Sequence, residues 1–166
     1  MPDRRRHLEL DLLFIAKYNM GLTIDDVVLI EALIDEPARY ASIIINLIES
    51  KINNCNSKTL YNLIESYKSG LKINGVFSHD WGLNRARRGK STRILKKIVS
   101  CIFGDDARLI VDLHSSIDMV YAGRFRCMHD YRKWATAHGI DPRVIEFVEA
   151  KLEQGVVHGE GACYKE

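Results

Sequence analysis

The sequence has little of what several classes of protein require. Its longest apolar run, Ala41 to Ile48, is far shorter than the roughly 20 residues that a membrane-spanning helix needs. Its four cysteines stand singly, and without a CxxC pair they form neither a zinc ribbon nor a thioredoxin-like motif. We therefore expect no membrane-spanning segment, and the cysteine usage favours a reducing, cytoplasmic setting.

The composition is that of a globular protein. Of the 166 residues, 46% are apolar and 28% are charged, which excludes a disordered chain or a fibre. A chain of this length can bury a core without disulfides or metals. No low-complexity linker interrupts it, so we expect one helical domain over residues 1–154. Residues 155–166 contain three glycines and no apolar periodicity, and we expect them to form a flexible tail.

Apolar residues recur at helical spacing from residue 7 to the end of the predicted domain. This pattern predicts an all-α fold, a single compact bundle of about seven or eight helices. A short hairpin through Asn74-Gly75, near 71–78, is compatible with the least regular stretch. The expected helices are 7–20, 25–36, 38–50, 60–70, 90–104, 106–123, 124–139 and 141–155.

Polar residues that cap helices mark several of these boundaries. Thr23, Ser91, Asp105 and Asp141 stand where N-caps are expected, and Asp141 is followed by a proline at the first helical position. Each of the last four helices ends in glycine, a residue that suits the C-terminal cap. The first helix is expected to end near Met20-Gly21.

Positive charge is concentrated in one segment, residues 85–97, which we call the basic segment. It holds seven bases and no acid, whereas the residues before it hold nine bases and eleven acids, and those after it eight and eleven. The net charge of the chain is +2, so the whole excess comes from this segment. Its bases are Arg85, Arg87, Arg88, Lys90, Arg93, Lys96 and Lys97.

A cluster of basic residues can neutralise phosphates, and nearby aromatic residues can stack on nucleobases. The basic segment therefore predicts a small regulatory protein that binds nucleic acid or another polyanion. An acidic protein partner, with this chain as an adaptor or inhibitor, is an alternative. Arg85, Arg87 and Arg88 are expected in a loop, ahead of a helix capped by Ser91.

The sequence does not predict a cofactor or a metal. Gly89 to Thr92 spell GKST, but a phosphate loop needs a glycine at position 84, which is Asn84, and a buried strand before it. Cys127 and His129 are two residues apart on a predicted helix, so they point to different faces and do not form a structural zinc site.

The stretch from Tyr131 to Leu152 has helix-turn-helix spacing. Ala135 lies in the first helix, Gly139 at the turn, and Ile140, Ile145 and Val148 point inward. A plain helical hairpin gives much the same pattern. Glu146, Glu149 and Glu153 would face the phosphates of a DNA ligand and repel them, which favours the plain hairpin.

The preceding residues, "RFRCMHDY", contain an arginine, a histidine five positions later, and a tyrosine. This pattern resembles the R-x4-H-x-Y signature of the HEPN superfamily, which consists of small helical proteins, many of them ribonucleases. The resemblance implies metal-independent RNA cleavage in the cleft of a homodimer, with Arg124, His129 and Tyr131 as the catalytic residues. Histidine can move a proton near neutral pH, and arginine can stabilise a pentavalent phosphate. Phe125 departs from the family, which usually has a polar residue there. The sequence therefore leaves a ribonuclease and a non-enzymatic binding protein as alternatives.

Overall fold

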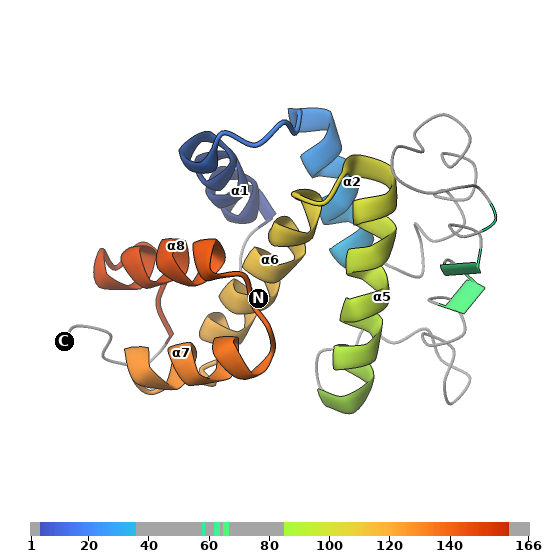
Figure 1. Ribbon diagram of the computed structural model, residues 1–166. Helices are drawn as coiled ribbons and strands as arrows, with labels where there is room; N and C mark the ends of the chain where they lie inside the picture. The colour runs from blue at the N-terminus through green and yellow to red at the C-terminus, as the bar shows by residue number, and fades with distance from the viewer. Residues whose placement is uncertain (1–3, 36–57, 59–61, 64, 67–84, 160–166) are drawn as a thin grey trace. The chain divides into compact units, whose positions relative to one another are not determined.

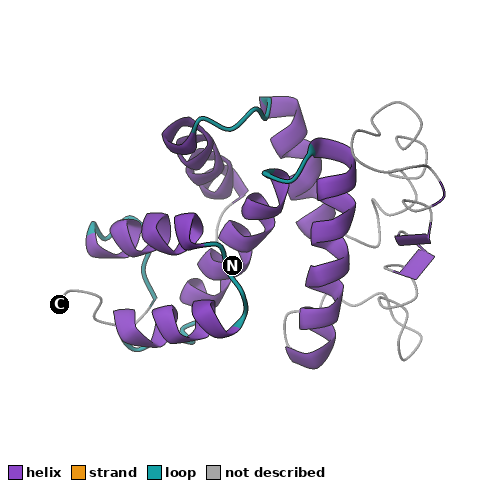
Figure 2. Ribbon diagram, in the orientation of Figure 1, coloured by secondary structure: helices purple, strands orange, loops and turns teal. Residues whose placement is uncertain are grey.

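The computed structural model describes residues 4–35, 58, 62–63, 65–66 and 85–159 (Figure 1). All regular structure in these residues is α-helical, with no strand among them (Figure 2), and this confirms the all-α class. The chain divides into two compact units. We call residues 1–20 with 112–166 the terminal unit and residues 21–111 the central unit.

Six helices are described, against the seven or eight expected for the whole chain. The expected helices over 38–50 and 60–70 and the hairpin near 71–78 lie largely outside the described residues, although residues 58, 62–63 and 65–66 are helical. None of the described helices is long and apolar enough to cross a bilayer. The helices are α1 (Arg4–Tyr18), α2 (Ile24–Asp35), α5 (Arg85–Phe103), α6 (Ala107–Tyr121), α7 (Met128–Ala137) and α8 (Pro142–Glu153).

Two of the predicted N-caps are confirmed. The hydroxyl of Thr23 accepts a hydrogen bond from the backbone amide of Asp26 (3.1 Å), and the Asp26 carboxylate accepts one from the amide of Thr23 (3.1 Å). This reciprocal pair satisfies two amides at the start of α2. At α8, the carboxylate of Asp141 accepts from the amide of Arg143 (2.8 Å), with Pro142 in the first turn.

Several predicted boundaries are wrong: the helix expected from residue 124 begins at Met128, and two others differ in their caps. Helix α1 ends at Tyr18, because Asn19 adopts the left-handed conformation (φ 52°) two residues before Gly21. Asparagine tolerates this conformation better than most residues. Helix α5 starts at Arg85, so Ser91 lies inside the helix and is not its cap. Arginine, alanine and lysine are strong helix formers, and the single Gly89 costs only about 1 kcal/mol against alanine.

The core of the terminal unit lies between α1, the part of α6 from Asp112, α7 and α8. The rings of Phe14 on α1 and Phe147 on α8 meet edge to face, with centroids 5.2 Å apart. Helices α7 and α8 lie side by side (Figure 1). On α7, the buried Tyr131 donates a hydrogen bond to the hydroxyl of Ser116 on α6 (3.1 Å), which ties these two helices together.

The central unit contains the contact between α2 and α5. Both helices bury one apolar stripe at three-to-four spacing, which is the pattern that packs one helix on another. The stripe consists of Val27, Ile30 and Leu33 on α2, and of Leu95, Ile98, Val99 and Ile102 on α5.

Two cysteines lie in the described residues. Cys101, which is buried on α5, is disulfide-bonded, and Cys127 is a free, half-buried thiol. The reducing, cytoplasmic setting expected from the cysteine spacing stays a prediction.

The cap of α8 gives a test of this fold. Replacing Asp141 with alanine leaves the amide of Arg143 without its acceptor, and we expect a loss of about 1 kcal/mol in the free energy of unfolding. Urea denaturation followed by circular dichroism measures it. Asp141→Asn is the control: it keeps a capping oxygen and loses only the surface ion pair with Arg143, so it should cost less than half as much.

Candidate functional site

The basic segment lies on one uninterrupted helix. Arg85, Arg87 and Arg88 are the start of α5, and not a loop as the sequence suggested. At a rise of 1.5 Å per residue, the bases from Arg85 to Lys97 span about 18 Å of helix axis. The free amides at the helix N-terminus belong to residues 85–88, because the first four amides of a helix have no partner within it. Gly89 to Thr92 lie beyond them, inside the helix.

The structure describes three side chains of the basic segment. Arg93 and Lys97, one helical turn apart, are exposed, and Lys96 is half-buried. The neighbouring Leu95, Ile98 and Val99 are buried in the central unit. Because Arg93 and Lys97 are spaced i, i+4, they project from the same face of α5. No acid lies on this helix to neutralise them. This part of α5 thus has one face in the core and one face that is positively charged.

The residues of the Arg-x4-His motif lie around the start of α7. Arg124 precedes the helix and is exposed, and His129 is exposed in its first turn. An arginine five residues before a histidine reaches the same surface only if the arginine lies before the helix begins. Arg124 lies before α7 and meets this condition. The neighbouring Asp130 carboxylate accepts a hydrogen bond from the backbone amide of Arg126 (3.0 Å).

Tyr131, the third residue of the motif, points the other way. Its side chain is fully buried, and its hydroxyl bonds Ser116 on α6. Burial raises the pKa of this tyrosine well above its ordinary value, while the hydrogen bond with Ser116 opposes part of the shift. The phenol therefore stays protonated, and Tyr131 is not brought to the surface that carries His129.

The α7–α8 hairpin has the turn that the sequence predicted. Gly139 adopts the left-handed conformation (φ 66°) between the two helices, and Ala135, Ile140 and Val148 are buried, with Ile145 half-buried. Glu146 and Glu153 are exposed on α8, as expected.

The N-terminal end of α8 is packed against α1. Tyr18 donates hydrogen bonds to the carbonyl oxygen of Arg143 and to the Glu146 carboxylate, each at 3.1 Å. Burial, and then the Glu146 carboxylate, raise the pKa of Tyr18. In a DNA-reading hairpin this end of the second helix contacts base edges. Its contacts with α1 and its carboxylates disfavour that role for α8.

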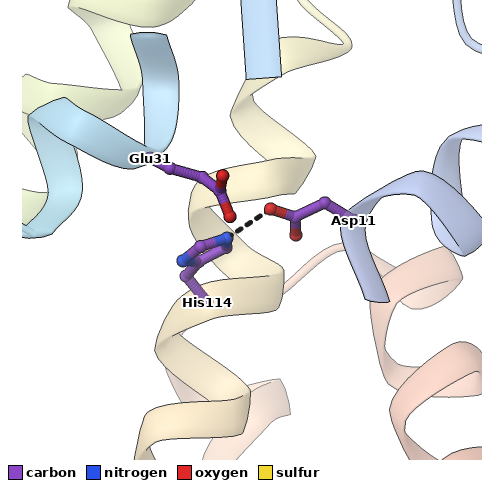
Figure 3. Close-up of side chains that lie close together, drawn as sticks. All are labelled: Asp11, Glu31 and His114. Carbon is purple, nitrogen blue, oxygen red and sulfur yellow. Dashed lines mark hydrogen bonds and ion pairs between the residues drawn. The ribbon is translucent and has the colours of Figure 1, made fainter. Parts of the chain in front are cut away.

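A buried polar cluster joins α1 to α6, and the sequence analysis missed it. The Nε2 atom of His114 lies 2.6 Å from a carboxylate oxygen of Asp11 (Figure 3, which also draws Glu31 of the central unit). The Nε2 atom of His7 lies 3.2 Å from a carboxylate oxygen of Asp118. The two imidazole rings stack, with centroids 4.4 Å apart and planes inclined by 17°.

The sequence does contain a signal for this cluster. His7 and Asp11 are spaced i, i+4 on α1, and His114 and Asp118 are spaced i, i+4 on α6. The two pairs cross, so that each histidine meets the aspartate of the other helix. Polar residues one turn apart on otherwise apolar faces indicate such a cross-helix arrangement.

The geometry of the cluster is that of a structural polar core. His7 is 5%, Asp11 0% and His114 1% exposed, so the stacked rings offer no access to a substrate, and only Asp118 of the cluster is partly exposed. Nearly parallel rings direct their in-plane lone pairs along separate planes, so the two imidazoles cannot both ligate one ion in their stacked position. Each Nε2 lies within hydrogen-bonding distance of a carboxylate oxygen of the other helix. The cluster therefore fixes how α1 lies on α6.

Removing one partner of a buried pair tests this role. In His114→Leu, the Asp11 carboxylate stays buried without its imidazole, and we expect a loss of about 3–5 kcal/mol in the free energy of unfolding. The double variant Asp11→Leu/His114→Leu removes both groups and should recover most of that loss. Urea denaturation measures both. His129→Ala, at an exposed histidine, serves as the control and should change stability by less than about 0.5 kcal/mol. A double variant no more stable than His114→Leu would contradict the pairing.

Comparisons of the chain with protein-family models, with curated proteins and with solved structures find no match. The charges, burial and contacts of the described residues are therefore the basis for inferring a function.

Proposed function

We propose that this protein binds nucleic acid through the basic segment of α5. The observation that carries the proposal is that seven bases and no acid lie on one continuous helix, with Arg93 and Lys97 exposed. Arg93 and Lys97, one turn apart, present their charges on the same exposed face of α5. Phosphates carry the negative charge that such bases neutralise.

The physical basis of this binding is the release of counterions. Each phosphate that a base neutralises frees condensed cations, and the affinity therefore falls as salt rises. For a single strand, the logarithm of the association constant falls with the logarithm of the salt concentration with a slope of about −0.7 per phosphate contacted. An acidic protein partner would also give salt dependence, so the nucleic acid itself is the discriminating ligand.

Reversing two exposed charges on α5 tests the proposal. In Arg93→Glu/Lys97→Glu, we expect weaker binding to a labelled single-stranded RNA and a salt slope that is shallower by about 1.4, the value for two phosphate contacts. Fluorescence anisotropy across a salt series measures both quantities. Circular dichroism should show an unchanged helix content, since both side chains are exposed.

The matched control is Lys17→Glu/Arg108→Glu, which makes the same change of charge at two exposed bases outside α5. Lys17 lies 4.0 Å from the Glu146 carboxylate in a surface pair, which is worth little to stability. The control should keep most of the RNA affinity. Equal losses in the two double variants would show that net charge alone drives binding, and no binding by the parent protein at low salt would favour an acidic protein partner.

RNA cleavage is a second candidate activity. It is favoured by the exposure of both Arg124 and His129 at the start of α7. In such a reaction His129 would move a proton of the attacking or leaving hydroxyl, and Arg124 would stabilise the charge that develops on the phosphate. Tyr131 would act only by positioning α7, because its hydroxyl is buried against Ser116.

The same binding samples, run on a denaturing gel, test the cleavage. If the parent protein shortens the RNA, we expect His129→Ala and Arg124→Ala each to abolish the products. Tyr131→Phe keeps the ring in the core and should retain cleavage. Products that persist in His129→Ala would indicate a contaminating nuclease and contradict the assignment.

A further inference from the structure

Four rings form a continuous aromatic column that runs from the core of the terminal unit to its surface. Phe125 and Tyr131 are buried, Trp134 is half-buried, and His138 is exposed. The centroids of Phe125 and Tyr131 are 5.5 Å apart, as are those of Phe125 and Trp134. Trp134 and His138 stack at 4.9 Å with an interplanar angle of 29°. The column thus ends in an imidazole ring that faces solvent.

The His138 ring is held in place from two directions. Its face stacks on the Trp134 indole, and its Nδ1 atom lies 2.9 Å from the carbonyl oxygen of Trp134. A carbonyl oxygen only accepts hydrogen bonds, so Nδ1 carries the proton. The ring is therefore fixed before any ligand arrives, and a ligand that stacks on it does not have to immobilise a freely rotating side chain.

The segment that carries this column holds several exposed bases, while the Glu149 and Asp112 carboxylates of the neighbouring helices lie near its buried Tyr131. Arg124, Arg126 and Lys133 are exposed, and the single acid from residue 122 to residue 140 is Asp130. The Asp130 carboxylate accepts a hydrogen bond from the backbone amide of Arg126. The exposed bases repel a cationic ligand, such as a methylated lysine. They attract a flat ring that is attached to a negative charge.

We propose that the His138–Trp134 stack is a platform for an unpaired base of single-stranded RNA. This inference rests on the nucleic-acid binding proposed above and names its form. A single strand offers a flat base beside its phosphate, whereas a duplex keeps its bases stacked inside. The RNA base lies on the exposed imidazole and extends the column by one ring. The nearby arginine and lysine side chains contact the phosphates of the strand.

Two oligomers separate stacking from phosphate contact. One is a labelled oligouridine, and the other is an abasic oligomer with the same number of phosphates. In His138→Ala, we expect affinity for oligouridine to fall about fivefold or more, as removal of a base–aromatic stack does, while affinity for the abasic oligomer is unchanged. Fluorescence anisotropy at fixed salt measures both. Thr136→Ala, at an exposed position of the same helix, is the control.

Two further substitutions distinguish the ring from its charge. His138→Phe keeps a flat ring and should bind oligouridine nearly as well as the parent. His138→Lys keeps a positive charge without a ring and should bind as weakly as His138→Ala. The reverse order, or equal losses for both oligomers, would show a charge contact and overturn the platform.

The tryptophan itself gives an independent readout. The chain contains two tryptophans, so Trp81→Phe leaves Trp134 as the only one. We expect oligouridine to quench its emission and the abasic oligomer to leave it unchanged. The platform would be refuted if both oligomers bind, quench the emission equally and bind His138→Ala as well as the parent. That result would still agree with nucleic-acid binding by α5. A parent protein that binds neither oligomer would refute both.

Discussion

The pairing of α1 with α6 is the interaction on which the terminal unit depends. Asp11 and His114 are 103 positions apart, and their side chains meet at 2.6 Å inside the protein. Apolar helix faces can slide along one another at modest cost, but a buried imidazole and its carboxylate partner meet in only one register. The crossed pairs on the two helices therefore select one placement of α1. Phe14 and Tyr18, farther along α1, then reach α8 in that placement.

Positive and negative charges are concentrated on different helices of this chain. Helix α5 carries seven bases and no acid, whereas α8 carries three glutamates and is engaged by α1. Electrostatics thus distinguishes the two features of the sequence that suggested nucleic-acid binding. The hairpin has the right spacing, but its contacts make it a part of the core. The basic segment has no recognisable motif, yet it carries seven bases and no acid, and Arg93 and Lys97 are exposed on it.

The sequence was sufficient for the features that depend on local chemistry. Apolar spacing predicted the all-α class, and the caps at Thr23 and Asp141 were found because a cap depends on residues only a few positions apart. It failed where two local signals compete: at Arg85, strong helix formers outweighed the glycine and serine that suggested a later start. It also failed where distant residues meet. The imidazole stack needs two helices placed together, and neither helix alone reveals the other's register.

The terminal unit is discontinuous in sequence, and this has a consequence for the order in which it folds. Residues 1–20 are made before their partners, which begin only at residue 112. On the ribosome, α1 must wait with its His7 and Asp11 side chains in water until α6 emerges, while the central unit is made in between. The entropy of closing so long a loop grows slowly with its length, so the equilibrium cost is modest. The delay is kinetic, because contacts between distant residues slow folding. An N-terminal helix that carries polar groups on its inner face tolerates this wait better than a wholly apolar helix would, since its exposed surface is less prone to aggregate.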